Sequence, residues 1–506
     1  MIGAPIRRQD PSTGEGALIK DRSRSGRSAF GFAPLDVPVA TVPEDARRRS
    51  VAGLPEVSEI DLVRHYTRLS QMNYGVDTGF YPLGSCTMKY NPKVAETVAS
   101  LPGFQRMHPL QPDRTAQGAL EMLWRLERAL CEITGMARAT MQPPAGACGE
   151  MTGLLMMRAY HADRGGGRGG SRTKILIPDS AHGTNPASVH LAGFQAVPVP
   201  SESRGLVDVG ALKALVDDKV AGLMLTNPNT LGLFEQEIEE IARIVHGVGG
   251  LVYYDGANLN AILGRCRPGD MGFDIVHINT HKTFATPHGG GGPGAGPVGV
   301  VEELVPYLPS PMVERDGVDG VFRWDHDRAK SIGRLHGFNG NMAVLVRSYA
   351  YVFLHGADGL KAVSELASLN ANYLASLVAN DFPLAFPDGR PMHEFVATVK
   401  PLKEDTGIRA MDVAKRLIDL GYHPSTVYFP LVVEEAMMVE PTETETKETL
   451  EGFASAMRQA AAEARSDPDL LRRAPVTTPV RRLDEARAAR HLKLRWGMPS
   501  PETGGG

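Results

Sequence analysis

Residues 274–296 read Asp-Ile-Val-His-Ile-Asn-Thr-His-Lys-Thr-Phe-Ala-Thr-Pro-His-Gly-Gly-Gly-Gly-Pro-Gly-Ala-Gly, which places Lys282 just beyond a short apolar run. The run predicts a buried strand, and the glycines predict backbone that can approach a bound molecule closely. Similar apolar runs occupy residues 174–178, 194–199, 221–226, 251–255 and 297–301, with helical patterns at 209–216 and 235–248. Apolar strands alternating with helices are typical of a mostly parallel sheet covered on both faces, so we predict an α/β domain.

The rest of the chain predicts a different organisation on each side of this domain. Residues 1–54 are rich in Pro, Gly, Arg and Ser and predict an extended arm, followed by a short amphipathic stretch at 56–70 and a loop at 81–92. Helices are expected at 118–134, 149–160, 341–354, 360–378 and 410–420, and a further strand at 394–400. We therefore predict an arm and active-site loop (1–110), a large α/β domain (111–336), a smaller α+β domain (337–475) and a tail (476–506).

Composition excludes several classes of protein. The 506 residues are 42% hydrophobic, which suffices for a sizeable core, and 54 Lys+Arg against 58 Asp+Glu give a net charge of −4. That balance argues against binding to nucleic acid or to an anionic membrane. The four cysteines form no CxxC pair and suggest neither disulfides nor a metal site, so a reducing cytoplasm is the expected compartment.

Lys282 is the first candidate for chemistry. A lysine at the end of a strand, beside a histidine and small hydroxyl side chains and before a glycine run, has the surroundings that an aldehyde cofactor requires. The alternative is a solvated surface lysine beside a flexible loop. Lys89, in the loop at 81–92, is the only obvious rival, and we rank it lower because no strand precedes it.

Asp255 ends the apolar run at 251–255 and precedes small residues, among them Ala257. An acid at that position can pair with a protonated pyridine nitrogen and keep the ring an electron sink, while Ala257 lets the backbone lie against the ring. A helix N-cap is the alternative role for the carboxylate. The spacing to Lys282, with one more strand between, favours the cofactor role.

Further polar residues are expected around the same pocket, because ligands bind outside the carboxyl ends of strands in such sheets. The turn at 142–150 leads into a helix and offers Gly146, Ala147 and Cys148 for a phosphate group and the ring face, although such a turn alone is a weak signal. Thr226 and Asn258 are weaker candidates for cofactor contacts. His182, in the loop at 179–188, has equal standing as a capping or core histidine and as a contact to cofactor or substrate.

Taken together, these motifs resemble the glycine dehydrogenase (decarboxylating) P-protein family, in particular the second subunit of its two-subunit bacterial form. The resemblance covers nearly the whole chain and includes the stretches at 81–92, 179–188, 254–261, 281–284, 287–294, 330–333, 392–395, 423–430 and 440–445. It implies the aminotransferase-like fold type I of pyridoxal-phosphate (PLP) enzymes, with the cofactor held as a Schiff base on Lys282. His182 and His281 are then candidates for orienting the substrate.

The resemblance also implies an activity and partners. The implied reaction is decarboxylation of glycine, with transfer of the aminomethyl group to the lipoyl group of H-protein. The implied assembly is an α2β2 heterotetramer with a companion subunit 1 that lacks the lysine. Two positions depart from the family pattern, since Cys148 stands where His or Gln is usual and Thr280 where an apolar residue is expected. The alternatives are another fold-type-I enzyme, such as an amino-acid decarboxylase or aminotransferase, and a non-catalytic scaffold subunit.

Overall fold

The computed structural model of the protein describes residues 18–49, 53–165, 172–478, 480–492 and 494. The chain divides into two compact units, one formed by Met1–Thr78 with Pro475–Gly506 and the other by Gly79–Ala474. The sequence-based boundaries near residues 110 and 336 both fall inside the second unit and stay predictions. None of the helices in the described ranges is long and apolar enough to cross a membrane.

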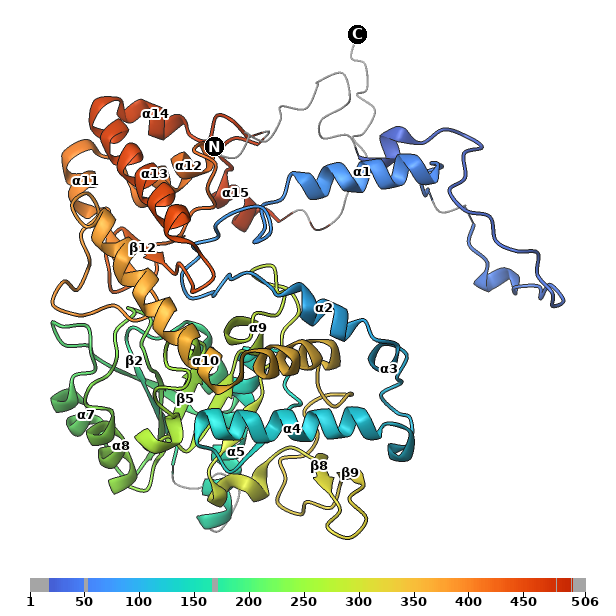
Figure 1. Ribbon diagram of the computed structural model, residues 1–506, viewed down its shortest axis with the longest axis horizontal. Coiled ribbons are helices and arrows are strands. Elements are labelled where there is room, and N and C mark those ends of the chain that lie inside the picture. Colours follow the sequence, from blue (N-terminus) through green and yellow to red (C-terminus); the bar gives the residue numbers. More distant parts are fainter. Residues whose placement is uncertain (1–17, 50–52, 166–171, 479, 493, 495–506) are drawn as a thin grey trace. The chain divides into compact units, whose positions relative to one another are not determined.

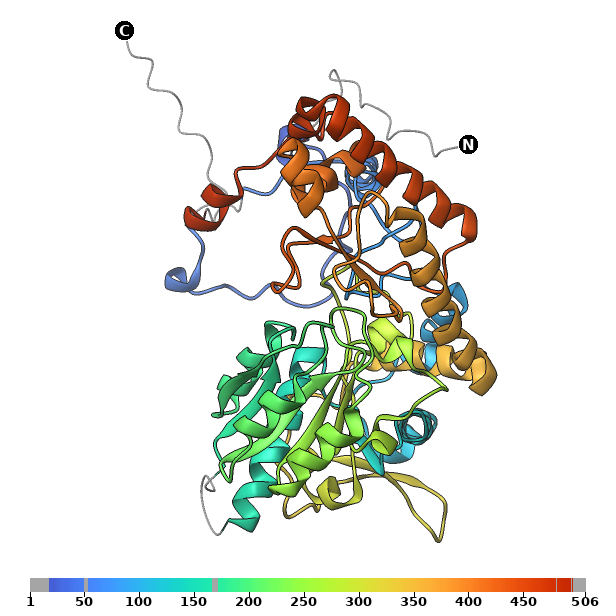
Figure 2. The ribbon, with the colours of Figure 1, turned by 90° about the vertical axis from the view of Figure 1, so that its left-hand side faces the viewer.

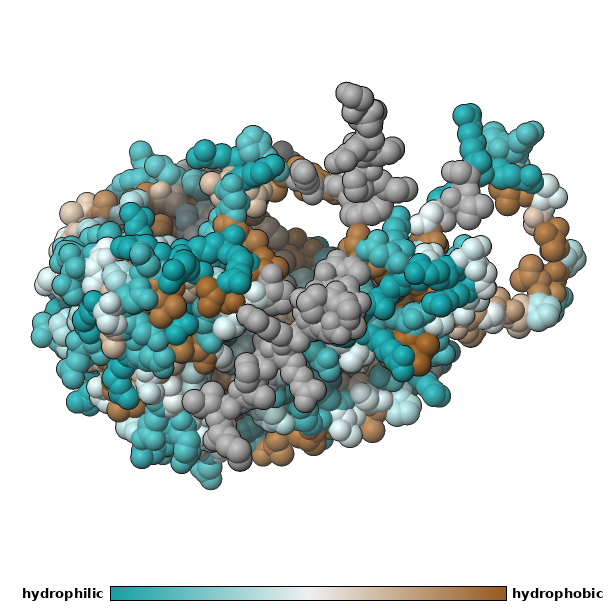
Figure 3. Space-filling model, turned by 90° about the horizontal axis from the view of Figure 1, so that it is seen from above, coloured by the Kyte–Doolittle hydropathy of each residue, from teal (hydrophilic) through white to brown (hydrophobic). Residues whose placement is uncertain are grey.

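The first unit is built around the amphipathic helix expected at 56–70, which is α1 (Glu59–Gln71). Ser58 caps it by accepting from the Asp61 N–H, and the Asp61 carboxylate reaches back to the Ser58 N–H, so two of the amides that a helix start leaves open are satisfied. Residues 18–49 expose large apolar side chains, including Phe30 and Phe32. In the space-filling view, brown apolar residues lie on the surface among teal polar ones (Figure 3). The unit also contains short helices, η2 (Ile19–Arg22), η3 (Glu44–Ala46) and α15 (Glu485–Arg490).

The second unit holds a seven-stranded sheet in the order β1-β7-β6-β5-β4-β2-β3. Figure 1 labels β2 and β5 of this sheet. Neighbours from β3 through β2, β4 and β5 to β6 run parallel, whereas β7 is antiparallel to β6 and β1 is antiparallel to β7. The prediction of a mostly parallel sheet is therefore confirmed. Its strands are β1 (Arg138–Thr140), β2 (Lys174–Pro178), β3 (Gln195–Val199), β4 (Val220–Thr226), β5 (Leu251–Gly256), β6 (Ile275–Ile278) and β7 (Val298–Val300).

Helices cover both faces of this sheet (Figure 2). Successive strand residues alternate between two hydrophobic clusters, as the two-residue period of a strand requires: Tyr254 belongs to one and Tyr253 to the other. The first cluster includes residues of α4 (Gln117–Thr134), α7 (Val209–Leu215) and α8 (Ile238–Gly247), and the second includes residues of α5 (Gly146–Arg164) and α6 (Thr184–Leu191). Burial on both faces explains why the central strands β4, β5 and β6 are mostly apolar.

Helix α10 (Met342–Val378) replaces the two helices expected at 341–354 and 360–378. Gly356 sits inside it with φ 60° and ψ −172°, a conformation that interrupts the helix and that glycine adopts readily. The first part of α10 packs in the sheet's core, and Leu374 and Val378 near its end pack in a separate core. The sequence therefore predicted the two straight segments correctly, but not their junction at a single glycine.

That separate core belongs to an α+β region, as predicted. An antiparallel sheet in the order β10-β12-β11 contains β10 (Phe395–Thr398), β12 (Ala436–Val439) and β11 (Thr426–Val427). Its helices are α11 (Lys400–Thr406), α12 (Ala410–Asp419), α13 (Lys447–Ser466) and α14 (Pro468–Arg473). The remaining elements of the second unit are α2 (Lys93–Ala99), α3 (Pro102–Gln105), η4 (Asp113–Thr115), η5 (Leu259–Ala261), η6 (Pro268–Met271), α9 (Thr280–Thr283), η7 (Glu302–Tyr307), β8 (Met312–Arg315) and β9 (Phe322–Asp325).

Candidate active site

The carboxyl ends of β4, β5 and β6 bring several predicted site residues to one edge of the sheet. Thr226 at the end of β4 lies opposite Asp255 on β5, and Gly256 lies opposite Ile278 at the end of β6. The chain leaves β6 through Asn279 and turns at once into the short helix α9, which carries Lys282. Parallel pairing thus places the acid and the lysine on adjacent strand ends, where α/β sheets bind their ligands.

Lys282 is half-buried, and its ammonium group donates a hydrogen bond to the Ser85 carbonyl oxygen at 2.8 Å. The alternative of a solvated surface lysine is therefore wrong. Its charge lowers the pKa of the neighbouring imidazoles of His182 and His281, which places it among them. One hydrogen bond to a carbonyl leaves a lysine two further N–H groups with which to meet a ligand.

Asp255 is buried and held by neighbours that favour its ionised form. Its carboxylate accepts hydrogen bonds from Asn185 Nδ2 and from the Ala257 N–H, both at 3.0 Å, and lies 3.3 Å from His277 Nε2. Desolvation alone would raise the pKa of Asp255, but His277, Asn185 and the Ala257 amide together hold it below the ordinary value. A buried carboxylate that stays ionised is suited to a cationic partner.

His182 joins the lysine through Ser85. Its Nε2 lies 2.5 Å from Ser85 Oγ, and its ring stacks on Phe429 with centroids 4.9 Å apart. Burial first and the charge of Lys282 second lower the pKa of His182 to about 4, so the ring is neutral at pH 7. Since Ser85 also binds Lys282, the two predicted residues lie in one site.

His281 lies on α9 beside Lys282 and forms an edge contact with His288, with ring centroids 5.3 Å apart. Its Nδ1 is 3.3 Å from the Ala295 carbonyl oxygen, which also accepts from the Thr280 hydroxyl at 3.4 Å. The hydrogen bond donated by the Thr280 hydroxyl explains why a polar residue can occupy this buried position. Burial, His288 and Lys282 lower the pKa of His281 to about 3, so this ring is neutral as well.

Helix α5 begins at Gly146, three residues earlier than the expected start at 149. A Cβ at Gly146 would lie 2.1 Å from Asn279 Oδ1, so the start of the helix and the end of β6 approach as closely as glycine permits. Ala147 is exposed and Cys148 half-buried, and burial raises the pKa of the Cys148 thiol. The first amides of a helix lack intrahelical partners and suit an anion, so these three residues form a cradle at the same sheet edge as Lys282.

Buried polar atoms without a hydrogen-bond partner in the described chain gather at this edge. They include Thr226 Oγ1, Asn258 Oδ1, Asn279 Oδ1 and Asn185 Oδ1. Leaving such atoms unpaired costs free energy, so their clustering fits a site that receives a polar ligand. With a cradle for phosphate, an ionised acid and an available amine, the residues present fit PLP. Ala257, which is also buried here, adds no polar atom.

Sequence reasoning missed the residues that hold the loop at 81–92. Glu394 accepts from the Ser85 N–H, and Glu440 accepts from the N–H and hydroxyl of Thr87. His393, Glu394 and Glu440 bring potential metal-ligand atoms within 4.8 Å of one another, although both carboxylates are already engaged by the loop. The stretches at 392–395 and 440–445 had been recognised only as family motifs, without any role.

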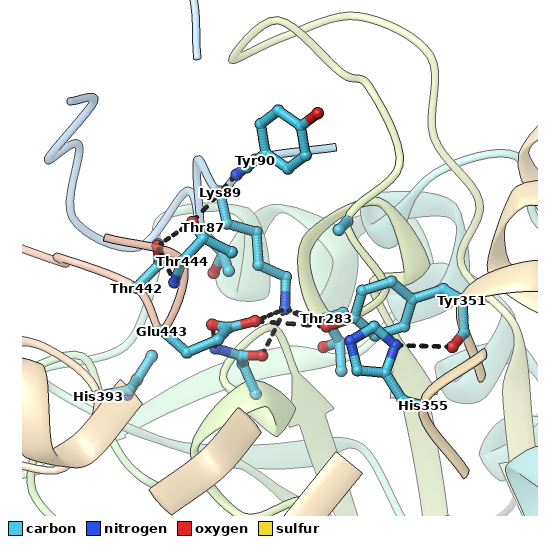
Figure 4. Close-up of polar contacts among 12 residues, drawn as sticks. Thr87, Lys89, Tyr90, Thr283, Tyr351, His355, His393, Thr442, Glu443 and Thr444 are labelled. Carbon is cyan, nitrogen blue, oxygen red and sulfur yellow. Dashed lines mark hydrogen bonds and ion pairs between the residues drawn. The ribbon is translucent and has the colours of Figure 1, made fainter. Parts of the chain in front are cut away.

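Lys89, the rival lysine, is buried in a different setting (Figure 4). Its ammonium group contacts Glu443 Oε1 at 2.7 Å, Asn260 Oδ1 at 2.8 Å, the Thr283 carbonyl oxygen at 2.8 Å and the Tyr351 hydroxyl at 3.2 Å. All of its donors are therefore occupied by protein groups, and its position beside Thr283 fixes the end of the helix that carries Lys282.

Comparison with known proteins shows which family this chain is similar to. Residues 20–319 match the family model described as glycine cleavage system P-protein, and residues 363–470 match that described as glycine dehydrogenase, C-terminal domain. A probable glycine dehydrogenase (decarboxylating) subunit 2 from Caldanaerobacter subterraneus subsp. tengcongensis is 57% identical over 95% of this chain and 98% of that protein. A protein of the same description from Thermococcus onnurineus is 54% identical over 95% of this chain and 96% of that protein.

Solved structures share the fold. A glycine decarboxylase (P-protein) of the glycine cleavage system, in inhibitor-bound form, superposes with a TM-score of 0.68 at 20% identity, covering 83% of this chain and 93% of that one. Glutamate decarboxylase from Lactobacillus brevis superposes with a TM-score of 0.64 at 14% identity, covering 87% and 99%. The second unit therefore has the aminotransferase-like fold type I that the sequence predicted.

Proposed function

The chain belongs to the glycine cleavage system P-protein family, and from this premise we propose that it is a PLP-dependent glycine dehydrogenase (decarboxylating). The observation that carries the proposal is that Lys282 and His182 meet on Ser85, at the sheet edge where Asp255 ends β5. The fold alone serves many reactions, so the choice of glycine depends on the relatives and on their match along the chain.

In this proposal Lys282 would anchor the cofactor covalently, and Asp255 would accept a hydrogen bond from its protonated ring nitrogen. The amides of Gly146, Ala147 and Cys148 would receive the phosphate, because a helix start favours an anion. Ala257 would lie against the ring. When bound, PLP supplies the sink for the electron pair that remains when glycine loses its carboxylate as CO2.

Thr226 and Asn258 complete the proposed cofactor site with their unpaired oxygens. His182 and His281 lie beside Lys282 in their neutral forms, so each can exchange a hydrogen bond with the substrate without adding a cation to the site. We assign them to orienting glycine. A carboxylate leaves most easily when its bond stands perpendicular to the ring, and orienting groups select that geometry.

The proposed partners follow from the family. The relatives are described as subunit 2, which implies a companion subunit 1, and we propose an α2β2 assembly with it. The aminomethyl group would pass to the lipoyl disulfide of H-protein: a carbon–sulfur bond forms, the sulfur–sulfur bond breaks, and the second sulfur leaves as a thiol. The disulfide is thereby reduced while the carbon is oxidised.

The test is release of labelled CO2 from carboxyl-labelled glycine by the PLP-loaded chain with its companion subunit and lipoylated H-protein. We expect release that depends on all three proteins. Release from glutamate or another amino acid instead of glycine would contradict the proposal and favour another fold-type-I enzyme.

A further inference from the structure

The loop around Cys86 adopts a conformation that its residues do not favour by themselves. Ser85 has φ 64° and Thr87 has φ 49°, both in the left-handed region that side chains other than glycine rarely adopt. Such residues persist only where the surrounding structure holds them, and they gather at functional sites. The contacts of Ser85 and Thr87 therefore show what holds this loop in shape.

Two buried glutamates hold it. Glu394 Oε2 accepts from the Ser85 N–H at 2.8 Å, while Glu440 accepts from the Thr87 N–H at 2.8 Å and from the Thr87 hydroxyl at 2.6 Å. Both side chains are fully buried. Burial keeps water from competing for these hydrogen bonds, so they are stronger than the same bonds would be at the surface.

The two glutamates come from adjacent strand ends. Phe395 of β10 lies opposite Val439 of β12, so Glu394 and Glu440 each stand one residue beyond this pair at the same end of the small sheet. At the same strand end, the Glu440 N–H donates a hydrogen bond to the Pro82 carbonyl oxygen at 3.3 Å. The C-terminal α+β region thus supplies the support for a loop that precedes the large domain in sequence.

Ser85 passes this support on to the candidate active site. Its carbonyl oxygen accepts from Lys282 Nζ at 2.8 Å, and its hydroxyl lies 2.5 Å from His182 Nε2. A shift of Ser85 would change the contacts of both groups at once. Within the described chain, neither glutamate forms a hydrogen bond to the amine or to the imidazole. Both interact with Lys282 through charge, and their hydrogen-bonded connection to it runs through the loop.

We propose that Glu394 and Glu440 are positioning residues that hold residues 85–87 in their strained form and thereby orient Lys282 and His182. The inference depends on the proposed function for its catalytic consequence. Its structural content, a loop fastened by two carboxylates, can be tested on the protein without cofactor or substrate.

Cys86 reports on the loop, because it lies between the two fastened residues and is half-buried. Since burial and the charges of Glu440 and Glu394 raise the pKa of its thiol, rates are compared for the thiolate, obtained from the pH dependence of alkylation. The experiment measures the rate at which iodoacetamide alkylates Cys86, located by peptide mass spectrometry, in the cofactor-free full chain. We expect Glu394→Gln and Glu440→Gln to raise this rate about tenfold, since an amide offers one acceptor oxygen where the carboxylate offers two. Thr87→Val, which removes the hydroxyl but keeps the shape of the side chain, should raise it to a smaller extent.

Glu435→Gln is the matched control. Glu435 is buried just before β12 and accepts from a backbone N–H, that of Ala410, at 3.0 Å, without touching the loop. Its rate should stay within about twofold of the parent protein. Equal rates in all three glutamine variants, or unchanged rates in Glu394→Gln, Glu440→Gln and Thr87→Val, would overturn the proposal.

A second measurement links the loop to the lysine. In the PLP-loaded protein, the pH midpoint of the cofactor's visible absorbance should shift by at least about half a unit in Glu440→Gln and should also shift in Thr87→Val, which loosens the loop without removing a charge near Lys282. It should remain unchanged in Glu435→Gln. An unchanged midpoint together with faster Cys86 alkylation would overturn the orienting role. If the parent protein carried no cofactor on Lys282, the proposed function would fail, while the alkylation rates would still test the loop.

Discussion

Lys89 and Lys282 both lie in the second unit, and the charges of both lower the pKa of the buried His393 imidazole. Their own surroundings differ. Lys89 is fully buried and contacts four protein groups, including the Glu443 carboxylate. Lys282 is half-buried, and within the described chain its ammonium group donates a hydrogen bond only to the Ser85 carbonyl oxygen. An amine whose donors are all occupied stabilises the fold, whereas an amine with donors to spare is available for a ligand.

The charge state of Lys89 supports this distinction. Burial alone would lower its pKa, but the charge of Glu443 and the hydrogen bonds that Lys89 donates to Glu443 and Tyr351 hold the pKa of Lys89 above the ordinary value. A lysine that keeps its proton is a poor nucleophile. Removing each lysine in turn is therefore expected to have opposite consequences for activity and for stability.

Lys282→Ala should show the largest effect on activity. With the anchoring amine removed, we expect glycine-dependent CO2 release to fall by roughly a thousandfold or more, while the free energy of unfolding changes by less than about 1 kcal/mol. The measurements are labelled CO2 release and urea unfolding of the cofactor-free chain. Activity near that of the parent protein would show that another residue holds the cofactor.

Lys89→Met should show the opposite pattern. Removing one partner of a buried ion pair leaves Glu443 uncompensated, at a cost of about 3–5 kcal/mol in the free energy of unfolding. Urea unfolding of the cofactor-free chain measures this. The double variant Lys89→Met/Glu443→Leu is the control and should recover much of the loss, because no charge is left unpaired. A loss below about 1 kcal/mol in the single variant would contradict the structural role of Lys89.

Glu440→Gln, a substitution near Lys282, should change how the free energy of unfolding depends on pH. Desolvation is the main cause that raises the pKa of Glu440 to about 7, above its ordinary 4.5. The protonated form of Glu440 contributes to the free energy of unfolding, and this contribution is fully present below pH 4.5 and is lost as the pH rises through 7. Relative to the parent protein, the variant should therefore gain up to about 3 kcal/mol between pH 4.5 and 8.

Thermal unfolding of the cofactor-free proteins at several pH values measures this difference. Glu132→Gln, at an exposed position of α4, controls for removing one carboxylate from the chain. A difference between Glu440→Gln and the parent protein that stays constant, or falls, as the pH rises would show that Glu440 is ionised throughout.

Gly146→Ala should have the smallest effect and tests the space kept open near Lys282. The added Cβ would clash with Asn279 Oδ1, so either the Asn279 side chain or the start of α5 has to shift, and PLP affinity should fall about tenfold. Gly183→Ala at the start of α6 is the matched control, since nothing lies within 4 Å of its Cβ position. PLP titration followed by visible absorbance compares them, and equal affinities would remove Gly146 from the cradle.

The fold could be predicted from the sequence where the local pattern of apolar residues is enough to identify a helix or strand. The strands at 174–178 and 251–255 are apolar throughout because both faces are buried, and their bounds were predicted to within a residue. The start of α5 was set too late because the sequence marks it with neither a capping side chain nor an acidic first turn. The kink at Gly356 could not be foreseen, because a lone glycine in a helical pattern is usually tolerated.

The site was predicted only in part for the same reason. Asp255 ends one apolar run and Lys282 follows another after three residues, so the pattern of runs predicted that both would lie at one sheet edge. Glu394 and Glu440 instead act on Ser85 and Thr87, which are 309 and 353 residues away in sequence. Such contacts depend on how two regions pack, and no local pattern encodes them. The one available signal was the pair His393 and Glu394 within the family motif at 392–395.

Reduction of the PLP-loaded protein with borohydride, followed by peptide mapping, tests the distinction between the two lysines most directly. The reduced cofactor should be found on the peptide that contains Lys282, with none on the peptide that contains Lys89. An adduct on Lys89, or none on Lys282 in protein that still releases CO2 from glycine, would contradict the assignment of the reactive amine.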